Sequence, residues 1–397
     1  MLPAHAVRRY RDSPRASAPP KARQAIENAS NPRETVATAS RPKSVQGDEE
    51  PTDSELAVHL AGGTSRHHRQ LSQPFGENED WLDLPPQAWR SAGWPATWCN
   101  RMAPWRQRET LTRERRLARS KGIRLLGSRG RSYPQWLRDI PDLPLALCVR
   151  GRWPPPEEAL SIVGARAATP TGRQMARACG QAAARSGVAV VSGLARGVDR
   201  CALEGTLDTG GWPLGVLGCG IDVVYPPENT AVQEAVARCG TLISEFPLGA
   251  RPTRYNFPRR NRIIAALCRQ LLVVEAGRKS GALITARYAL ELGREVWVVP
   301  GAVDSPQSTG SNELLYDGAQ PVVDPARLPE MLGIFSHGPR ESIETEPLLV
   351  TLGRRALTPD EIADEMQLSA HKVRSRLIAL ELEGRITCSA GGRYLKI

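Results

Sequence analysis

Residues 188–207, VAVVSGLARGVDRCALEGTL, join a short apolar run to a helical stretch through a glycine-containing turn. The apolar residues at the start do not alternate with polar ones, which is typical of a strand covered on both faces. Gly193 and Gly197 allow the backbone to turn sharply and to approach a ligand closely. The stretch therefore predicts one strand, one loop and one helix of an α/β domain.

Five further apolar runs of the same kind surround it in the chain: LSIVGA, LGVLGCG, TLISEFP, QLLVVEAG and EVWVVPG. Helical segments such as GRQMARACGQAAARSG and ALITARYALELG lie between them. Strands that alternate with helices form parallel sheets, because a parallel crossover needs a long connection. We therefore predict an α/β fold with a doubly wound parallel, Rossmann-like sheet over residues 132–325.

The flanks of this core differ in composition. Residues 1–52 are rich in Pro, Ser, Ala and charge, which predicts a disordered tail. Residues 53–131 read as short helices with Gly and Pro breaks, and they contain most of the tryptophans. A linker is expected over residues 326–345. Residues 346–397 have a winged-helix outline, with a capping box at Thr358–Glu361 and a hairpin around Gly391-Gly392.

The charge of the chain permits an anionic partner. The formal net charge is +11, and of the 53 basic residues only six are Lys. Arginine binds phosphate through a bidentate fork, which suits nucleic acid, although a coding bias towards Arg explains the excess equally well. Residues 101–131 hold 11 basic and two acidic side chains, which indicates either a solvated helix face or a nucleic-acid surface.

The cysteines and the N-terminus bear on the compartment. The eight cysteines are scattered without CxxC pairs, which argues against zinc sites and a disulfide scaffold. No signal peptide and no membrane-length apolar run is found. We therefore expect a cytoplasmic protein with no membrane partner, no metal and no cofactor.

The loops at the carboxyl ends of the predicted strands carry the binding chemistry. In doubly wound sheets ligands bind at this edge. Glycines, helix N-termini and arginines meet there in four loops, which predicts an anion site larger than one phosphate. Phe257 is either a core residue or a base-stacking platform. The loops are Gly164–Arg166, Ser192–Gly197, FPLGARPTRYNFPRRNR (246–262) and GRKSGALIT (277–285).

Few features favour an enzyme. Neither GxGxxG nor GxxxxGK[ST] occurs, which argues against dehydrogenases and NTPases. None of the six histidines lies in the predicted sheet domain, so acid–base catalysis lacks its usual side chain there. For Asp199 we expect a structural role as a helix cap.

Several motifs together resemble one known family. VVSGLARGVDRCALEGTL, VLGCGIDVVYPPEN, LISEFPLG, FPRRNRIIAAL, VVEAGRKSGALITARYALELGREVWVVPG and GSNELLYDGA look like the DNA-processing protein A family (DprA, also called Smf). The resemblance implies a small helical SAM-like N-terminal domain and a C-terminal winged helix. It also implies a cytoplasmic homodimer that binds single-stranded DNA, protects incoming strands in natural transformation and helps load the RecA recombinase, without catalysing a reaction.

The same resemblance names site residues. By motif, the strand-binding positions are Arg166, Ser192, Gly193, Arg196, Phe257, Arg260, Asn261, Arg262, Gly281 and Thr285. Loop chemistry alone adds Gly164 and Gly197, and charge alone adds Arg259, so that Arg259, Arg260 and Arg262 are expected to face a string of phosphates. The dimer seam is expected around residues 314–323.

The chain also departs from the family pattern. Leu203 stands where the family commonly has a histidine, which is expected to alter the pocket wall. The glycine hairpin of the N-terminal domain is reduced to Gly62-Gly63-Thr64, so phosphate contacts there are doubtful. The winged helix is not markedly basic, with eight basic and eight acidic residues in 343–397, which favours a protein contact over duplex binding.

The main alternative is a nucleotide-cleaving phosphoribohydrolase on a similar sheet. That family carries a PGGxGTxxE segment, whereas the comparable stretch here, GRKSGALITARYAL, lacks its glutamate. A weaker alternative is an adaptor whose winged helix binds duplex DNA.

Overall fold

The computed structural model describes residues 49–76, 79–333, 347–352, 356–366, 368–382, 386–389 and 392–396. The described residues from 347 onward belong to a second compact unit. Most of the predicted tail lies outside the described residues. Its last residues are ordered, because Glu49 accepts a hydrogen bond from the Ser132 N–H at 3.0 Å and Pro51 is buried. The tail predicted over residues 1–52 therefore extends too far.

The first unit is built on one mixed sheet of nine strands. All six predicted strands are present, and the predicted fold class is confirmed. In spatial order the strands are β1 (Arg124–Gly127), β2 (Ala146–Gly151), β6 (Thr241–Ser244), β5 (Pro213–Leu217), β4 (Ala189–Ser192), β3 (Ala159–Val163), β7 (Gln270–Val273), β8 (Glu295–Val298) and β9 (Gln320–Pro321).

The strands from β6 to β9 pair in parallel, whereas β1 and β2 add an antiparallel edge that the sequence analysis did not predict. Because β1 belongs to the sheet, the predicted domain boundary at residue 131 falls inside the sheet domain. The strand order reverses at β3, which lies between β4 and β7. Such a switch point opens a crevice at the carboxyl ends of the strands, because the flanking loops diverge to opposite faces.

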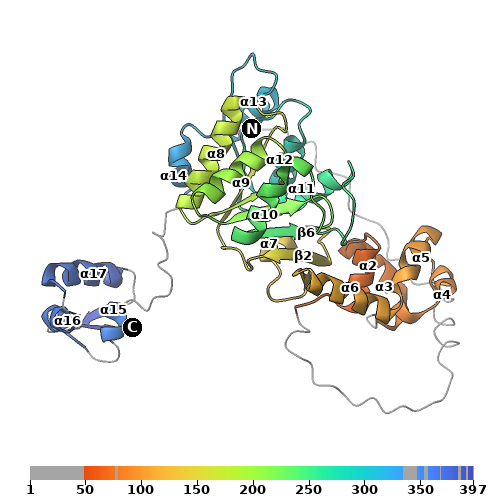
Figure 1. Cartoon of the computed structure of the whole chain (residues 1–397), viewed down its shortest axis with the longest axis horizontal. Coiled ribbons are helices and arrows are strands. Elements are labelled where there is room, and N and C mark those ends of the chain that lie inside the picture. The colour runs from red at the N-terminus through yellow and green to blue at the C-terminus, as the bar shows by residue number, and fades with distance from the viewer. Residues whose placement is uncertain are drawn as a thin grey trace, which may run out of the picture. The chain divides into compact units, whose positions relative to one another are not determined.

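Two hydrophobic cores lie on the two faces of this sheet. One core includes residues of α8 (Pro170–Arg185), α9 (Val198–Asp208) and α10 (Thr230–Cys239). The other includes residues of α7 (Gln135–Arg138), α11 (Asn256–Ala266) and α12 (Gly281–Glu291) (Figure 1). The strands pack apolar side chains against both layers, which explains why their sequences do not alternate.

After β8, the chain forms α13 (Thr309–Tyr316) and α14 (Leu328–Met331). The buried side chain of Leu328 joins the same core as α8. The linker predicted over residues 326–345 thus begins with a packed helix, and its residues 334–345 lie outside the described ones.

Short helices precede the sheet, as expected: α2 (Asp53–Leu60), α3 (Ser65–Ser72), α4 (Pro86–Ser91), α5 (Ala96–Met102) and α6 (Arg108–Ser120). Thr52 and Glu55 form a capping box at the start of α2. Trp89 and Trp94 stack with ring centroids 4.9 Å apart, and Trp81 meets Trp94 edge-on. Aromatic area of this kind supplies the core of the small helical region.

The second unit contains α15 (Pro347–Leu352), α16 (Pro359–Met366), α17 (Ala370–Leu382) and a hairpin of β10 (Ile386–Ser389) and β11 (Arg393–Lys396). Leu352, Ile362, Leu377 and Leu380 form its core. The predicted capping box is confirmed, since the Thr358 N–H donates to Glu361 and the Glu361 N–H donates to Thr358. None of the helices in the described ranges combines the length and the apolar run that a bilayer crossing needs.

Candidate functional site

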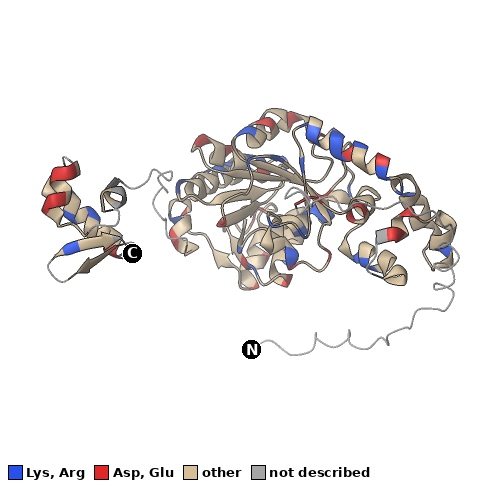
Figure 2. Cartoon of the chain, turned by 90° about the horizontal axis from the view of Figure 1, so that it is seen from below, with Lys and Arg blue, Asp and Glu red and all other residues tan. Residues whose placement is uncertain are grey.

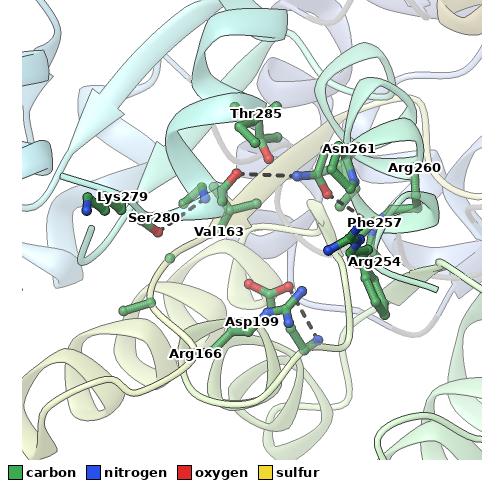
Figure 3. Close-up of a pocket in the computed structure, with 18 of the residues that line it drawn as sticks. Val163, Arg166, Asp199, Arg254, Phe257, Arg260, Asn261, Lys279, Ser280 and Thr285 are labelled. Atoms are coloured by element: carbon green, nitrogen blue, oxygen red, sulfur yellow. Dashed lines mark hydrogen bonds between the residues drawn. The ribbon is translucent and has the colours of Figure 1, made fainter. Parts of the chain in front are cut away.

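A cavity of about 740 Å³ opens at the carboxyl end of β3, at the switch point of the sheet. Three segments line most of it: residues 163–166 after β3, residues 252–258 leading into α11, and residues 277–282 leading into α12. Figure 3 shows their side chains around the opening. The loops predicted to carry the binding chemistry therefore do meet in one place.

Five basic side chains line the cavity wall: Arg166, Arg254, Arg260, Arg278 and Lys279. Arg166, Arg254 and Lys279 are exposed and form no ion pair with another described residue. Arg278 pairs with Glu313 at 2.8 Å, but both side chains are largely exposed, so solvent weakens this pair. Three exposed cations that form no ion pair with a described residue make this open cavity a site for a polyanion.

An aromatic platform lies within the same cavity. The rings of Phe257 and Tyr225 contact each other with centroids 5.5 Å apart. The guanidinium of Arg166 lies over the Phe257 ring at 4.9 Å. A Cβ on Gly218 would come within 2.8 Å of Phe257, so this glycine lets the ring sit where it does. Stacked rings beside cations form the chemistry that holds unpaired bases.

Helix α12 presents its N-terminus to the cavity. Its N-cap residue Ser280 accepts a hydrogen bond from the Ala282 N–H at 3.2 Å, and Asn261 donates to the Gly281 carbonyl at 3.3 Å. Beyond them Thr285 is buried in the cavity wall. The partial positive charge of a helix start adds to that of the side chains.

Arg260 lines the cavity, but its guanidinium forms hydrogen bonds within the protein. Its guanidinium donates to the carbonyl of Gly193 at 2.7 Å and to that of Val216, and only 3% of the residue is exposed. Burial lowers the pKa of Arg260 to about 10. The phosphate contact of Arg260 stays a prediction, since its donors connect the loop after β4 to β5.

Arg259 and Arg262 do not line the cavity, so their contact with phosphates stays a prediction that this arrangement does not support. Three residues apart on α11, they share a face that meets Glu245 at the end of β6. Glu245 is 2% exposed, and this burial raises its pKa while both arginines oppose the shift. Sequence spacing alone does not reveal a buried carboxylate on the neighbouring strand.

The loop after β4 is also satisfied internally. Ser192 is buried and donates to the Ile162 carbonyl at 2.6 Å, so it has no place in the cavity. The N–H groups of Gly193 and Ala195 donate to Asp199 at 3.1 and 3.4 Å. Asp199 thus holds this loop, where a helix cap was expected. Burial raises the pKa of Asp199, and Arg260 opposes the shift.

Gly197 adopts a positive φ of 73°, and a Cβ there would lie 2.2 Å from the Ala165 carbonyl. Gly197 therefore allows the turn before α9, and it lines neither the main cavity nor the smaller hollow beside it. A smaller hollow adjoins the main cavity and shares Arg166 and Phe257 with it. Arg196 lines this hollow and pairs with Glu228, with both side chains exposed.

Nine of the thirteen predicted residues thus line the cavity or its adjoining hollow: Gly164, Arg166, Gly193, Arg196, Phe257, Arg260, Asn261, Gly281 and Thr285. Sequence reasoning missed Tyr225, Thr253, Arg254, Arg278, Lys279 and Ser280. The basic residues among these lie in loops that had been singled out, whereas no local signal marks Tyr225. Leu203 is fully buried and does not line the cavity. The expectation that it alters the pocket wall is therefore wrong, and Leu203 is a residue of the hydrophobic core.

Comparison with known families agrees with this arrangement. The family described as DNA recombination-mediator protein A matches residues 124–333, and the DprA winged helix domain matches residues 338–392. The chain belongs to the DNA recombination-mediator protein A family. The resemblance drawn from the sequence motifs is therefore confirmed.

Three relatives of this family show the extent of the likeness. Protein Smf of Synechocystis sp. is 34% identical over 307 residues, covering 66% of this chain and 77% of that protein. Protein Smf of Escherichia coli is 36% identical over 281 residues, covering 67% and 75%. The solved structure of DNA processing protein A from Streptococcus pneumoniae has a TM-score of 0.59 and 29% identity, covering 71% of this chain and 98% of that one.

Proposed function

We propose that this recombination-mediator protein binds single-stranded DNA in the cavity at the end of β3. In this proposal it protects incoming strands during natural transformation and passes them to the RecA recombinase. The observation that carries the proposal is that Arg166, Arg254 and Lys279 line the same cavity as Phe257, with Arg166 over its ring (Figure 3). Exposed cations that form no ion pair bind phosphates, and an aromatic ring beside them is the group on which an unpaired base stacks.

The geometry favours a single strand over a duplex. Phe257 and Tyr225 lie inside a cavity, and a ring in a cavity stacks only on a base that has left its own stack. In duplex DNA the bases are paired and stacked, and a protein reaches only their edges in the grooves.

The carboxylates near the cavity support binding without catalysis. Asp199 accepts from two backbone N–H groups and faces Arg260, so it is held in place by its neighbours. Glu275 accepts from the Thr169 N–H at 3.0 Å and occupies the N-terminus of α8. That helix start is where a doubly wound fold usually holds a phosphate. A phosphoribohydrolase would need these groups free.

Two further parts of the proposal concern assembly. Val303, Tyr316 and Val323 are 95%, 94% and 72% exposed, which supports a homodimer through the edge near α13 and β9. On the second unit, Arg374 pairs with Asp360 at 3.2 Å and Arg393 pairs with Glu361 at 3.3 Å. Solvent weakens such exposed pairs, so the balance of eight basic and eight acidic residues in 343–397 is what supports a protein contact, such as RecA, over binding of a duplex.

We propose a cytoplasmic location, which the cysteines support. All eight are free thiols, five of them buried, which supports a reducing cytoplasm.

A salt titration tests the proposal. Anisotropy of labelled oligo-dT should give log K falling with log[salt] at a slope of about −2 to −3, since three to four phosphates are neutralised. A duplex competitor should displace the oligonucleotide weakly. Salt-independent binding, or release of free base from nucleoside monophosphates, would overturn the proposal.

A further inference from the structure

The basic run of residues 101–131 divides into two groups in the structure. One group is paired with carboxylates and fastens the helical region. Its pairs are Arg108 with Asp53 and Asp83, Arg115 with Glu50 and Asp53, Arg119 with Glu50, Lys121 with Asp222, and Arg129 with Glu55. The other group includes Arg113 and Arg116, which are exposed and form no ion pair with another described residue.

Arg113 and Arg116 lie on one face of α6. Their three-residue spacing makes them neighbours on the helix surface. This face is opposite Leu111 and Ala118, which are buried in the helical core. Leu117, next to Arg116, is 39% exposed. We call Arg113, Arg116 and Leu117 the α6 face; Figure 2 shows basic residues recurring along this helix.

A hydrogen-bonded link joins α6 to the rim of the cavity. Lys121 is the residue that follows α6, and its ammonium donates to the Asp222 carboxylate at 2.6 Å. The same carboxylate accepts from the Gly249 N–H at 2.8 Å. Gly249 opens the segment 249–254, which carries the exposed Arg251 and then reaches the cavity with Arg254. Five residues span at most about 18 Å, so the C-terminal end of α6 lies close to where a bound strand would leave the cavity.

We propose that the α6 face is a second contact for single-stranded DNA, reached by the strand after it leaves the cavity along residues 249–254. The two guanidinium groups bind phosphates through paired N–H donors, and Leu117 offers an apolar contact to a base or sugar. This inference rests on the proposed function. It gives the helical region a role in holding long strands while the cavity holds a short one.

The experiment compares oligo-dT of two lengths on the full chain. An oligonucleotide of about 6 nucleotides occupies the cavity alone, and one of about 25 nucleotides reaches α6 as well. The double variant Arg113→Ala/Arg116→Ala should leave the affinity for the short strand unchanged. It should weaken binding of the long strand about fivefold and make its salt slope shallower by about 1.4, because two phosphate contacts are lost.

The matched control is Arg185→Ala/Arg238→Ala. These exposed arginines lie at the C-terminal ends of α8 and α10, which lead into the amino ends of β4 and β6 and so lie at the opposite edge of the sheet. It should bind both lengths as the unaltered protein does. The reversal Arg113→Glu/Arg116→Glu should weaken long-strand binding further.

The outcomes are distinct. If the α6 variants bind the long strand as the unaltered protein does, or lose both lengths equally, the α6 face is not a DNA contact. If the unaltered protein binds neither length, the proposed function itself fails.

Discussion

The guanidinium carbon of Arg166 lies 4.9 Å from the centroid of the Phe257 ring. Arg166 comes from the loop after β3 and Phe257 from the first turn of α11, so residues 91 positions apart combine a charge and a ring at one point. A nucleotide binding here meets its phosphate contact and its stacking platform together.

Replacing the ring tests the platform. Phe257→Leu keeps an apolar side chain of similar length but removes the stacking face. We expect single-strand affinity to fall by about 1–2 kcal/mol, or roughly tenfold, as measured by anisotropy with oligo-dT. The melting temperature should change little, because Phe257 is only half-buried. Unchanged affinity would exclude stacking on this ring.

Two arginines of the same segment should behave in opposite ways. Arg254 is exposed on the cavity wall, so Arg254→Ala should reduce DNA affinity about fivefold and leave the free energy of unfolding unchanged. Arg262 pairs with Glu245, whose side chain is 1% exposed, so Arg262→Ala should lower that free energy by about 2 kcal/mol. Urea unfolding and oligo-dT titration of both variants separate the two roles. Equal effects on binding would contradict the assignment.

Glycine substitutions distinguish open space from close packing. A Cβ on Gly281 meets no atom within 4 Å and its φ is compatible with alanine, so Gly281→Ala should fold normally. Because Gly281 lines the cavity, the added methyl should still reduce DNA affinity. Gly218→Ala instead pushes on Phe257 and should lower both affinity and stability. A Gly281→Ala variant that binds DNA normally would show that the strand does not approach α12.

The buried His59 should make the free energy of unfolding depend on pH. It is buried, and burial together with Arg259 lowers its pKa from 6.5 to about 4. The unfolded chain therefore binds the proton more readily, so this contribution is complete above pH 6.5 and is lost as the pH falls towards 4. We expect His59 to account for about 2 kcal/mol of lost stability between pH 7 and pH 5.

The check is urea unfolding at both pH values for the unaltered chain and for His59→Gln. The variant should lose about 2 kcal/mol less between pH 7 and pH 5. The raised pKa values of Asp199 and Glu245 act in the opposite direction, since a buried acid gains stability on protonation, and they cancel in this comparison. Parallel losses in the two proteins would exclude His59 as the source.

The parallel core, the order of its strands and helices along the chain, and the loops that meet at its edge could all be predicted from the amino-acid sequence. Short apolar runs with glycines at their ends are local patterns, and they can be recognised in the sequence before the fold is known. The same holds for the Thr358–Glu361 capping box, which needs only four consecutive residues.

Which charges are available to a ligand became apparent from the folded chain alone. Arg259, Arg260 and Arg262 are equivalent in sequence, yet two meet Glu245, one clamps the carbonyls of Gly193 and Val216, and none is free. Tyr225 reaches Phe257 from a loop after β5, 32 positions earlier in the chain. The residue that pairs with a given side chain is determined by how helices and strands pack together. The charge of that side chain in the sequence does not predict which residue this will be.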